Sequence, residues 1–240
     1  MPGPRYRMVA TTQRISDAVS RNAGFRPAVL AHLPLPEPGD SDDRSDVGPD
    51  VRRALDRMNA MPSLLVFGAM HGKKHLELIA GLPEFLPAGW QLVVAGAPLV
   101  DGVAVYAELE RASGAQPVVT IAREVTDAEV RALMAAAAAA LVPQRAGEAS
   151  MSGVLLDTIA AEIPVIAPMG SSAGDVVEGA SLGSTYRVDD WVSIGPAVVA
   201  AGERFRPDTS VLARHGILPA EAWAQAVVAQ IPNGTGTARA

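Results

Sequence analysis

From residue 51 onward, short apolar runs alternate with segments of helical spacing, and this alternation limits the possible folds more than any other feature of the chain. The clearest runs are SLLVF at 63–67, WQLVVA at 90–95 and PVIA at 164–167. A strand that is apolar at nearly every position is buried on both faces, and strands that alternate with helices form mainly parallel sheets. We therefore predict an α/β fold with a Rossmann-like, mainly parallel sheet and helices on both of its faces.

Composition excludes several classes of protein. The 240 residues, 49% of them hydrophobic, suffice for one large α/β domain or two small ones. A net charge of -6 without a basic run argues against nucleic-acid binding. The chain has no cysteine and its histidines are scattered, so we expect neither disulfides nor a metal site. The longest apolar run, 132–142, is too short to cross a bilayer, and we expect a soluble, cytoplasmic protein.

The segment PLPEPGDSDDRSDVGPD at 34–50 is rich in proline, glycine and aspartate, which is typical of a linker or exposed loop. It separates a short strand–helix–strand segment, residues 1–33, from a larger domain, residues 51–240. In the larger domain, the capping-box pattern of Thr126 and Glu129 predicts a helix that runs to about Ala139. Other predicted elements are helices at 51–59, 74–82, 102–113, 191–201, 209–215 and 220–230, and strands at 117–122 and 141–142.

Ligands of such sheets bind outside the carboxyl ends of the strands. The segments expected at that edge contain glycine or serine in most cases; they are 68–74, 96–100, 122–125, 144–152 and 168–174. This edge is therefore the predicted site.

The segment from Gln144 to Ala167 is the strongest candidate within this edge. Ser152 and Gly153 stand where a helix should begin, and first-turn N–H groups together with the helix dipole favour an anion there. Asp157 lies one turn further along the same face, where it could accept hydrogen bonds from hydroxyl groups. A nucleoside diphosphate offers both features. An acidic residue on the solvated face of a helix would have the same spacing, so both interpretations stay open.

The loop GAMHGKKH at 68–75 follows a predicted strand and precedes a predicted helix. It is not a Walker A loop, and the chain has no G-x-G-x-x-G fingerprint. What remains is a glycine-lined turn in which His71, Lys73 and Lys74 could face an anion. A strand–helix turn with solvated lysines is the alternative, and Arg145 and Glu148 could likewise be ordinary surface residues.

Residues 170–174, GSSAG, match the G-x-S-x-G pattern of a nucleophile elbow. A serine hydrolase would then use Ser172 with Asp189 or Asp190 and His215. The glycines that follow leave about two turns of helix, fewer than an elbow helix normally has.

Several segments together resemble the C-terminal, donor-binding half of GT-B glycosyltransferases of the family-4 type. LLVFGAMHGKKHLELIAGL is similar to that family's strand–"FG-x-(x)₃-KG"–helix segment, and SGVLLDTIAAEIPVIAPMGSSAGDVVEG is similar to "SGVLLEALAAGVPVIA…GG-x-x-EVV-x-G". The similar segments follow one another in unbroken order from about Pro62 to Ala201. His71 stands where many members have arginine, and Glu162 stands where they have glycine.

The resemblance implies that a lysine and helix amides hold the diphosphate of a nucleotide sugar, with no metal or other cofactor. Asp157 takes the ribose-binding position of the family's E-x₇-E pattern, whereas the first glutamate falls on Ala149, beside Glu148. The expected catalytic residue is Glu148, and the expected donor-binding residues are Gly68, His71, Lys74, Arg123, Arg145, Ser152, Gly153 and Asp157.

A complete GT-B enzyme also has an N-terminal acceptor domain, and residues 1–33 resemble only the final β-α-β piece of one. We therefore expect a glycosyltransferase, or a truncated or subunit form of one, that works with an acceptor-domain partner subunit or as a homo-oligomer. The alternatives are a non-catalytic binding or assembly subunit with a GT-B-like fold and, more remotely, the serine hydrolase.

Overall fold

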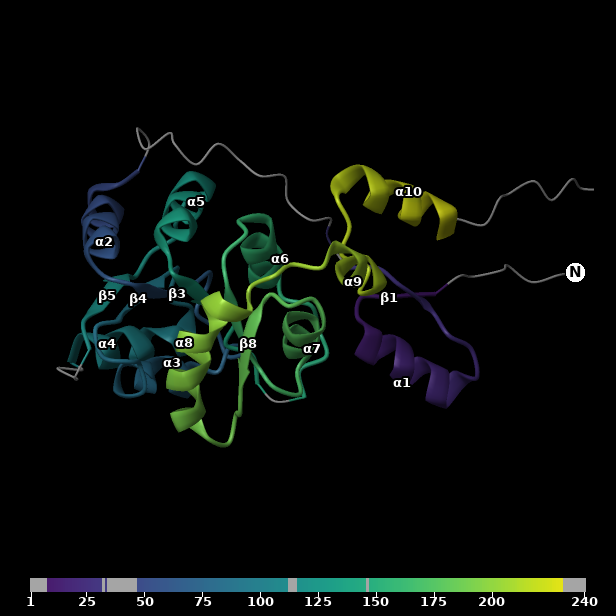
Figure 1. Cartoon of the computed structure of the whole chain (residues 1–240), viewed down its shortest axis with the longest axis horizontal. Helices are drawn as coiled ribbons and strands as arrows, with labels where there is room; N and C mark the ends of the chain where they lie inside the picture. The colour runs from purple at the N-terminus through teal and green to yellow at the C-terminus, as the bar shows by residue number, and fades with distance from the viewer. Residues whose placement is uncertain (1–7, 32, 34–46, 112–115, 146, 231–240) are drawn as a thin grey trace, which may run out of the picture.

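The computed structural model describes residues 8–31, 33, 47–111, 116–145 and 147–230, and the structural statements below concern these residues. A six-stranded sheet in which every neighbouring pair is parallel forms the centre of the larger domain (Figure 1). Its strands lie in the order β5-β4-β3-β6-β7-β8. They are β3 (Ser63–Phe67), β4 (Gln91–Ala95), β5 (Val118–Ile121), β6 (Ala139–Leu141), β7 (Val165–Pro168) and β8 (Gly183–Tyr186).

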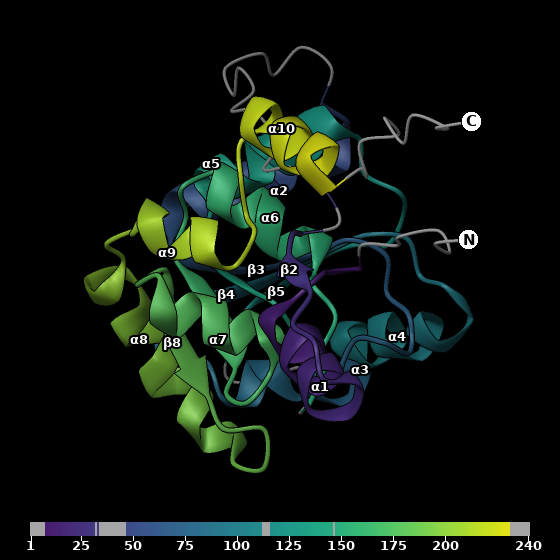
Figure 2. The same cartoon turned by 90° about the vertical axis from the view of Figure 1, so that its right-hand side faces the viewer.

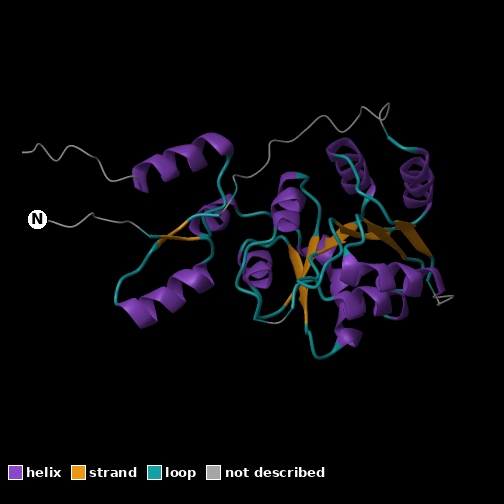
Figure 3. Ribbon diagram, turned by 180° about the vertical axis from the view of Figure 1, so that it is seen from behind, coloured by secondary structure: helices purple, strands orange, loops and turns teal. Residues whose placement is uncertain are grey.

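Helices cover both faces of this sheet, as predicted (Figure 3). The α-helices of the larger domain are α2 (Pro49–Ala60), α3 (Leu76–Gly81), α4 (Val103–Arg111), α5 (Asp127–Ala136), α6 (Gly153–Ala160), α7 (Ser172–Gly179) and α8 (Ile194–Arg204). Short 3₁₀ helices are η1 (Leu82–Glu84), η2 (Val100–Gly102) and η3 (Trp191–Ser193). No helix in the described part of the chain is long and apolar enough to cross a membrane.

Successive side chains of a central strand point to opposite faces of the sheet, and each face has its own hydrophobic core. Leu64 and Val66 of β3 belong to a cluster with residues of α3, α4 and α8. Leu65 and Phe67 point to the other face and pack with residues of α2 and α5. Both faces of β3 are therefore buried, which explains why its sequence is apolar at consecutive positions.

The strand order reverses beside β3. The chain runs outward from β3 through β4 to β5, and then returns to form β6 on the other side of β3. In open α/β sheets, the crevice beyond the carboxyl ends of the strands at such a reversal is where ligands bind. The loops after β3 and β6 meet there. They contain the glycine-lined turn at 68–75 and the segment that leads into Ser152 and Gly153.

A smaller unit lies at the other end of the molecule. It contains β1 (Val9–Ala10), α1 (Gln13–Ala23) and β2 (Ala28–Val29), and the two strands pair in parallel. The C-terminal helices α9 (Thr209–Arg214) and α10 (Ala220–Gln230) lie at this end, and β2 lies between α10 and α1 (Figure 2). The Trp223 indole N–H donates to the Ala31 carbonyl at 2.8 Å.

Trp223 of helix α10 contacts Ala31 of the N-terminal segment, and the division of the chain into domains stays a prediction. Two of the predicted element boundaries need correction. Residues 34–46 of the predicted linker lie outside the described residues, but Val47 is buried and α2 already begins at Pro49. The helix of the capping box ends at Ala136, before Ala139, because β6 begins there.

Arg123 explains why α2 begins early. Its guanidinium makes two hydrogen bonds to the Asp50 carboxylate, at 2.7 and 2.8 Å, and two to Glu129 at the same distances. Glu129 also accepts the N–H groups of Gly48 and Thr126, both at 3.0 Å. The side chain of Arg123 thus joins the starts of α2 and α5, and it is not among the residues that line the cavity described below. Its expected role in donor binding stays a prediction.

This network predicts an acid-sensitive fold. The Arg123 guanidinium lowers the pKa of Asp50 and of Glu129 to about 2. A carboxyl whose folded pKa is lowered contributes stability above its unfolded pKa and loses it as the pH falls toward the folded value. The midpoint of thermal unfolding should therefore drop between about pH 4.5 and pH 2. Arg123→Met should lower the midpoint at pH 7 and flatten this dependence; an unchanged midpoint at pH 7 would contradict the role of the network.

Candidate functional site

Lys74 carries a partly buried ammonium group at the carboxyl end of β3. Its Nζ donates to the carbonyls of Phe67 at 2.5 Å and of Gly68 at 3.0 Å. Burial lowers the pKa of Lys74 to about 8, and no described carboxylate forms an ion pair with it. A partly buried cation without a carboxylate partner is costly, so a place where an anion could offset the charge is a candidate site.

The backbone around Lys74 links the two loops of the strand reversal. Lys74 forms an isolated antiparallel bridge with Gln144, and the His75 N–H donates to the Pro143 carbonyl at 2.8 Å. Gly68 has a φ of +86°, and a Cβ added there would stand 3.4 Å from the Lys74 Nζ and 3.5 Å from Val154 in the first turn of α6. The ammonium group therefore lies close to the start of α6.

Helix α6 begins as the sequence predicted. Ser152 is its N-cap residue, but the Ser152 side chain makes no capping hydrogen bond, and Gly153 is the first helical residue. A Cβ added at Gly153 would meet no atom within 4 Å, so the space in front of the backbone is open. The first-turn N–H groups are thus available to an anion near Lys74.

Beside this helix start, a cavity of about 960 Å³ opens between α5 and α6. Gly68 and Gly96 line it where β3 and β4 end, and Glu124 and Val125 line it in the loop after β5. At Gly96, where φ is +150°, a Cβ would approach the Gly68 carbonyl oxygen to 2.3 Å, so only glycine fits this part of the wall. The volume is in the range of small-molecule sites.

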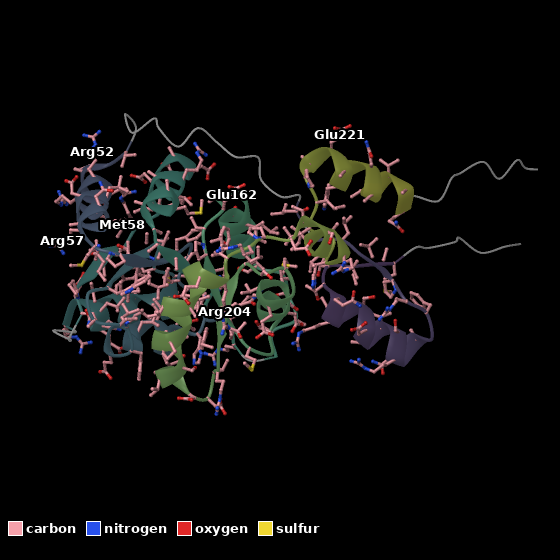
Figure 4. All side chains as sticks on the ribbon, viewed as in Figure 1. Arg52, Arg57, Met58, Glu162, Arg204 and Glu221 are labelled. Carbon is pink, nitrogen blue, oxygen red and sulfur yellow. The ribbon has the colours of Figure 1, made fainter. Side chains whose placement is uncertain are left out.

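Asp157 of α6 is among the residues that line the cavity, and its contact with a ligand there stays a prediction. Burial, with a further contribution from Asp127 on α5, raises the pKa of Asp157. Glu162 lines the same wall just after α6 (Figure 4) and has a φ of +54°. That left-handed conformation suits glycine, the residue expected there from the family resemblance.

His71 and Arg145 lie outside the wall of the cavity. The His71 Nδ1 accepts the Lys73 N–H at 3.1 Å, and burial together with Lys74 and Lys73 lowers the pKa of His71. Arg145 is more than half exposed and lies 3.5 Å from Glu77. Their sequence-predicted contacts with an anion stay predictions.

Glu148 precedes α6 in the loop after β6. Its carboxylate accepts the Ser150 N–H at 2.9 Å and the Ser150 hydroxyl at 2.7 Å. These hydrogen bonds, and a weaker attraction from Lys73, lower the pKa of Glu148. The group is therefore an ionised hydrogen-bond acceptor at neutral pH and unsuited to donating a proton.

The serine-hydrolase alternative has no support in the geometry. Ser172 begins the two-turn helix α7, but its hydroxyl donates to the Ala149 carbonyl at 2.9 Å. Asp189 is exposed and pairs weakly with Arg187. His215 lies near Gly179, at the opposite end of α7 from Ser172, so no nucleophile–base pair forms among the described residues.

The sequence analysis missed part of the cavity wall. Asp127 and Arg131, one turn apart on α5, both line it. The capping box had located the start of α5 correctly, and a helix that begins at the carboxyl end of β5 should direct its first turns toward the ligand edge. That signal could have added both residues to the candidates.

The pKa shift of Asp157 predicts an effect on stability. Because the folded pKa is raised above the unfolded value of 3.8, the ionised carboxylate destabilises the fold as the pH rises. Asp157→Asn should raise the midpoint of thermal unfolding at pH 7, and the gain should vanish below about pH 3.8.

Asp127→Asn is the matched control, because it removes the same charge from the same cavity. Asp127 lies in the first turn of α5, where the helix dipole favours a carboxylate, but it also repels Asp157, so this change should raise the midpoint less than Asp157→Asn does. A destabilising effect of Asp157→Asn at pH 7 would show that Asp157 is instead a structural partner.

A known family matches this chain in sequence, and solved structures resemble it in fold. The family model of group 1 glycosyl transferases matches residues 61–200. The fold resembles a UDP-forming α,α-trehalose-phosphate synthase from Burkholderia xenovorans, with a TM-score of 0.67 and 16% identity over 94% of this chain and 60% of that one. No curated protein sequence matches significantly.

Two further solved structures share the fold. Anabaena HepE, crystallised with UDP and glucose, gives a TM-score of 0.64 at 14% identity over 93% of this chain and 62% of that one. WaaG, a glycosyltransferase of lipopolysaccharide biosynthesis, gives 0.58 at 18% identity over 90% and 58%. The chain thus spans about 60% of the length of these proteins. It belongs to the group 1 glycosyl transferases and has the fold of the GT-B glycosyltransferases.

Proposed function

We propose that this chain is the nucleotide-sugar-binding half of a glycosyltransferase. The observation that carries the proposal is the ammonium of Lys74, which has no carboxylate partner among the described residues and lies beside the open start of α6. It is close to Gly68 and Val154, which line the same cavity as Asp157. The solved structure of HepE with UDP-glucose shows that a protein of this fold takes such a ligand.

The site combines carboxylates with a separate place for an anion. Carboxylates of Glu124, Asp127, Asp157 and Glu162 line the cavity between α5 and α6, together with one cation, Arg131. Lys74 and the first-turn amides of α6 lie beside Gly68 and Val154, which also line the cavity. A nucleoside diphosphate has the matching pattern, because its sugar and base carry hydrogen-bond donors and its diphosphate is an anion.

In this arrangement, Asp157 accepts the ribose hydroxyls and the loop after β5 flanks the base. The diphosphate lies between Lys74 and the N–H groups of Ser152 and Gly153. An acceptor hydroxyl oxygen forms a bond to the sugar carbon as the bond from that carbon to the phosphate oxygen breaks, and the electron pair of the broken bond leaves with the diphosphate. The proton of the acceptor hydroxyl passes to the departing diphosphate or to solvent. Donors that already point at the phosphate oxygen stabilise the developing charge without reorganising.

Glu148 contributes as an acceptor. Its ionised carboxylate lies in the loop that leads into α6, one residue before the position at which the family carries its first glutamate. We assign it to the hydroxyl groups of the transferred sugar. The bond to Ser150 also favours a second candidate function, a non-catalytic donor-binding subunit, because it already uses part of the carboxylate's capacity.

The acceptor half is proposed to come from a further domain or subunit. The N-terminal unit has only the two short strands β1 and β2 among the described residues, and a sheet of this size is marginal alone. Large apolar side chains are exposed on it: Met8, Val9, Phe25 and Leu33. Association with an acceptor-type domain would cover them, whereas self-association would make a homo-oligomer that covers the same residues.

The lysines of the 68–75 loop provide the test of donor binding. Lys74→Met should weaken the binding of UDP or GDP about 10- to 100-fold, the loss expected for a charged hydrogen bond. Lys73→Met removes the same charge from an exposed neighbour and should cost less than about threefold. Isothermal titration calorimetry measures both, and circular dichroism checks the fold.

The same titration has a defined pH dependence. With a Lys74 pKa of about 8, the ammonium form falls about tenfold between pH 7 and pH 9, and wild-type affinity should fall with it. Lys74→Met should show a flat profile over this range. Equal losses from the two lysine variants, or a wild type that binds no nucleoside diphosphate, would overturn the proposed function.

A further inference from the structure

The loop from Glu148 to Ser152 connects β6 to the amides of α6, and four donor groups from three residues hold its backbone carbonyls. The Glu148 carbonyl accepts the Ser172 N–H at 2.9 Å. The Ser150 carbonyl accepts the Gln144 side-chain amide at 3.2 Å. Between them, the Ala149 carbonyl accepts two hydroxyl groups at once.

These two hydroxyls come from opposite parts of the chain. Ser172, at the start of α7, donates to the Ala149 oxygen at 2.9 Å. Thr12, 137 residues away from Ala149 in the N-terminal unit, donates to the same oxygen at 2.7 Å and is only 2% exposed. The Thr12 oxygen also accepts the Ile15 N–H, so it caps α1 and contacts the loop simultaneously.

A second contact fixes α1 against α7. Arg14 makes two hydrogen bonds to the Asp175 carboxylate, at 2.6 and 2.8 Å. The first turn of α1 and the first turn of α7 are therefore held together, and each places a hydroxyl on the Ala149 carbonyl. A network of this kind restricts the loop more than either hydroxyl would alone.

The hydrogen bonds to the Ala149 carbonyl also fix the N–H of the same peptide, which belongs to Ser150. Because a trans peptide is planar, its N–H points away from its C=O. The hydroxyls that hold the Ala149 carbonyl thus also orient the Ser150 N–H, which meets the Glu148 carboxylate at 2.9 Å. The direction of the loop into Ser152 and Gly153 is set at the same point.

We propose that Thr12 is a positioning residue for the donor site: its hydroxyl, supplied by the N-terminal unit, holds the Glu148–Ser152 loop in the geometry that receives the diphosphate. This inference rests on the proposed function for the identity of the ligand, but the restraint on the loop exists in the free protein. The N-terminal unit then takes part in donor binding through the loop that the Thr12 hydroxyl holds.

The first experiment measures amide hydrogen exchange of the free protein. Thr12→Val removes the hydroxyl and keeps the shape, so exchange should become faster in 147–152 and stay unchanged in β3. Thr12→Ser keeps the hydroxyl and should restore slow exchange. Ser20→Ala is the control, because it removes from the same helix a hydroxyl that has no hydrogen-bond partner. Unchanged exchange of 147–152 in Thr12→Val would overturn the proposal.

Helix capping must be separated from the restraint on the loop. Thr12→Val also removes the N-cap of α1 and should lower the unfolding midpoint. Thr12→Asp keeps an acceptor for the Ile15 N–H but cannot donate to a carbonyl, so it should exchange in 147–152 as fast as Thr12→Val. Slow exchange in Thr12→Asp would show that capping alone matters and would overturn the proposal.

The second experiment titrates the same variants with UDP and GDP. Loss of one buried hydrogen bond should weaken binding roughly fivefold in Thr12→Val and Thr12→Asp, with wild-type values in Thr12→Ser and Ser20→Ala. Faster exchange with unchanged affinity would overturn the positioning role while leaving the proposed function intact. A wild type that binds neither nucleotide would instead overturn the proposed function, and with it the role of Thr12 in donor binding.

Discussion

The ammonium of Lys74 lies against the carbonyl oxygens that end β3, and the site is arranged around this contact. Burying a charge costs free energy, and two carbonyl dipoles offset only part of that cost, which is why the pKa of Lys74 falls to about 8. The contact is possible because the strand order reverses beside β3, so that the loops after β3 and β6 pair and bring the lysine next to α6. A bound anion would complete the set of interactions that the protein leaves unfinished.

Several elements of the fold could be predicted from the sequence alone. Strand β3 and helix α10 have the predicted bounds, and Ser152 begins α6 as expected, because continuous apolar runs, helical spacing and capping residues are local signals. Asp157 lines the cavity, an orientation that depends on how α6 packs and not on the spacing of residues in the sequence. The assignments of these residues to donor groups stay predictions.

What the sequence could not supply is long-range pairing. The family resemblance led us to expect Arg123 in the donor site. In the structure, its guanidinium forms an ion pair with Asp50, 73 residues earlier. The indole N–H of Trp223 in helix α10 donates to the Ala31 carbonyl, 192 residues away. The Thr12–Ala149 hydrogen bond has the same character. No periodicity or motif encodes such contacts, since each depends on which elements the finished sheet brings together.

Through these long-range contacts, the N-terminal unit packs against α10 and holds the loop before α6. The central claim is that a nucleoside diphosphate binds across this loop, Lys74 and the cavity. The most direct measurement is a crystal structure with UDP or GDP bound. We expect diphosphate density between the Lys74 Nζ and the amides of Ser152 and Gly153, with ribose hydroxyls on Asp157. Nucleotide density elsewhere on the protein, with this cavity empty, would contradict the account.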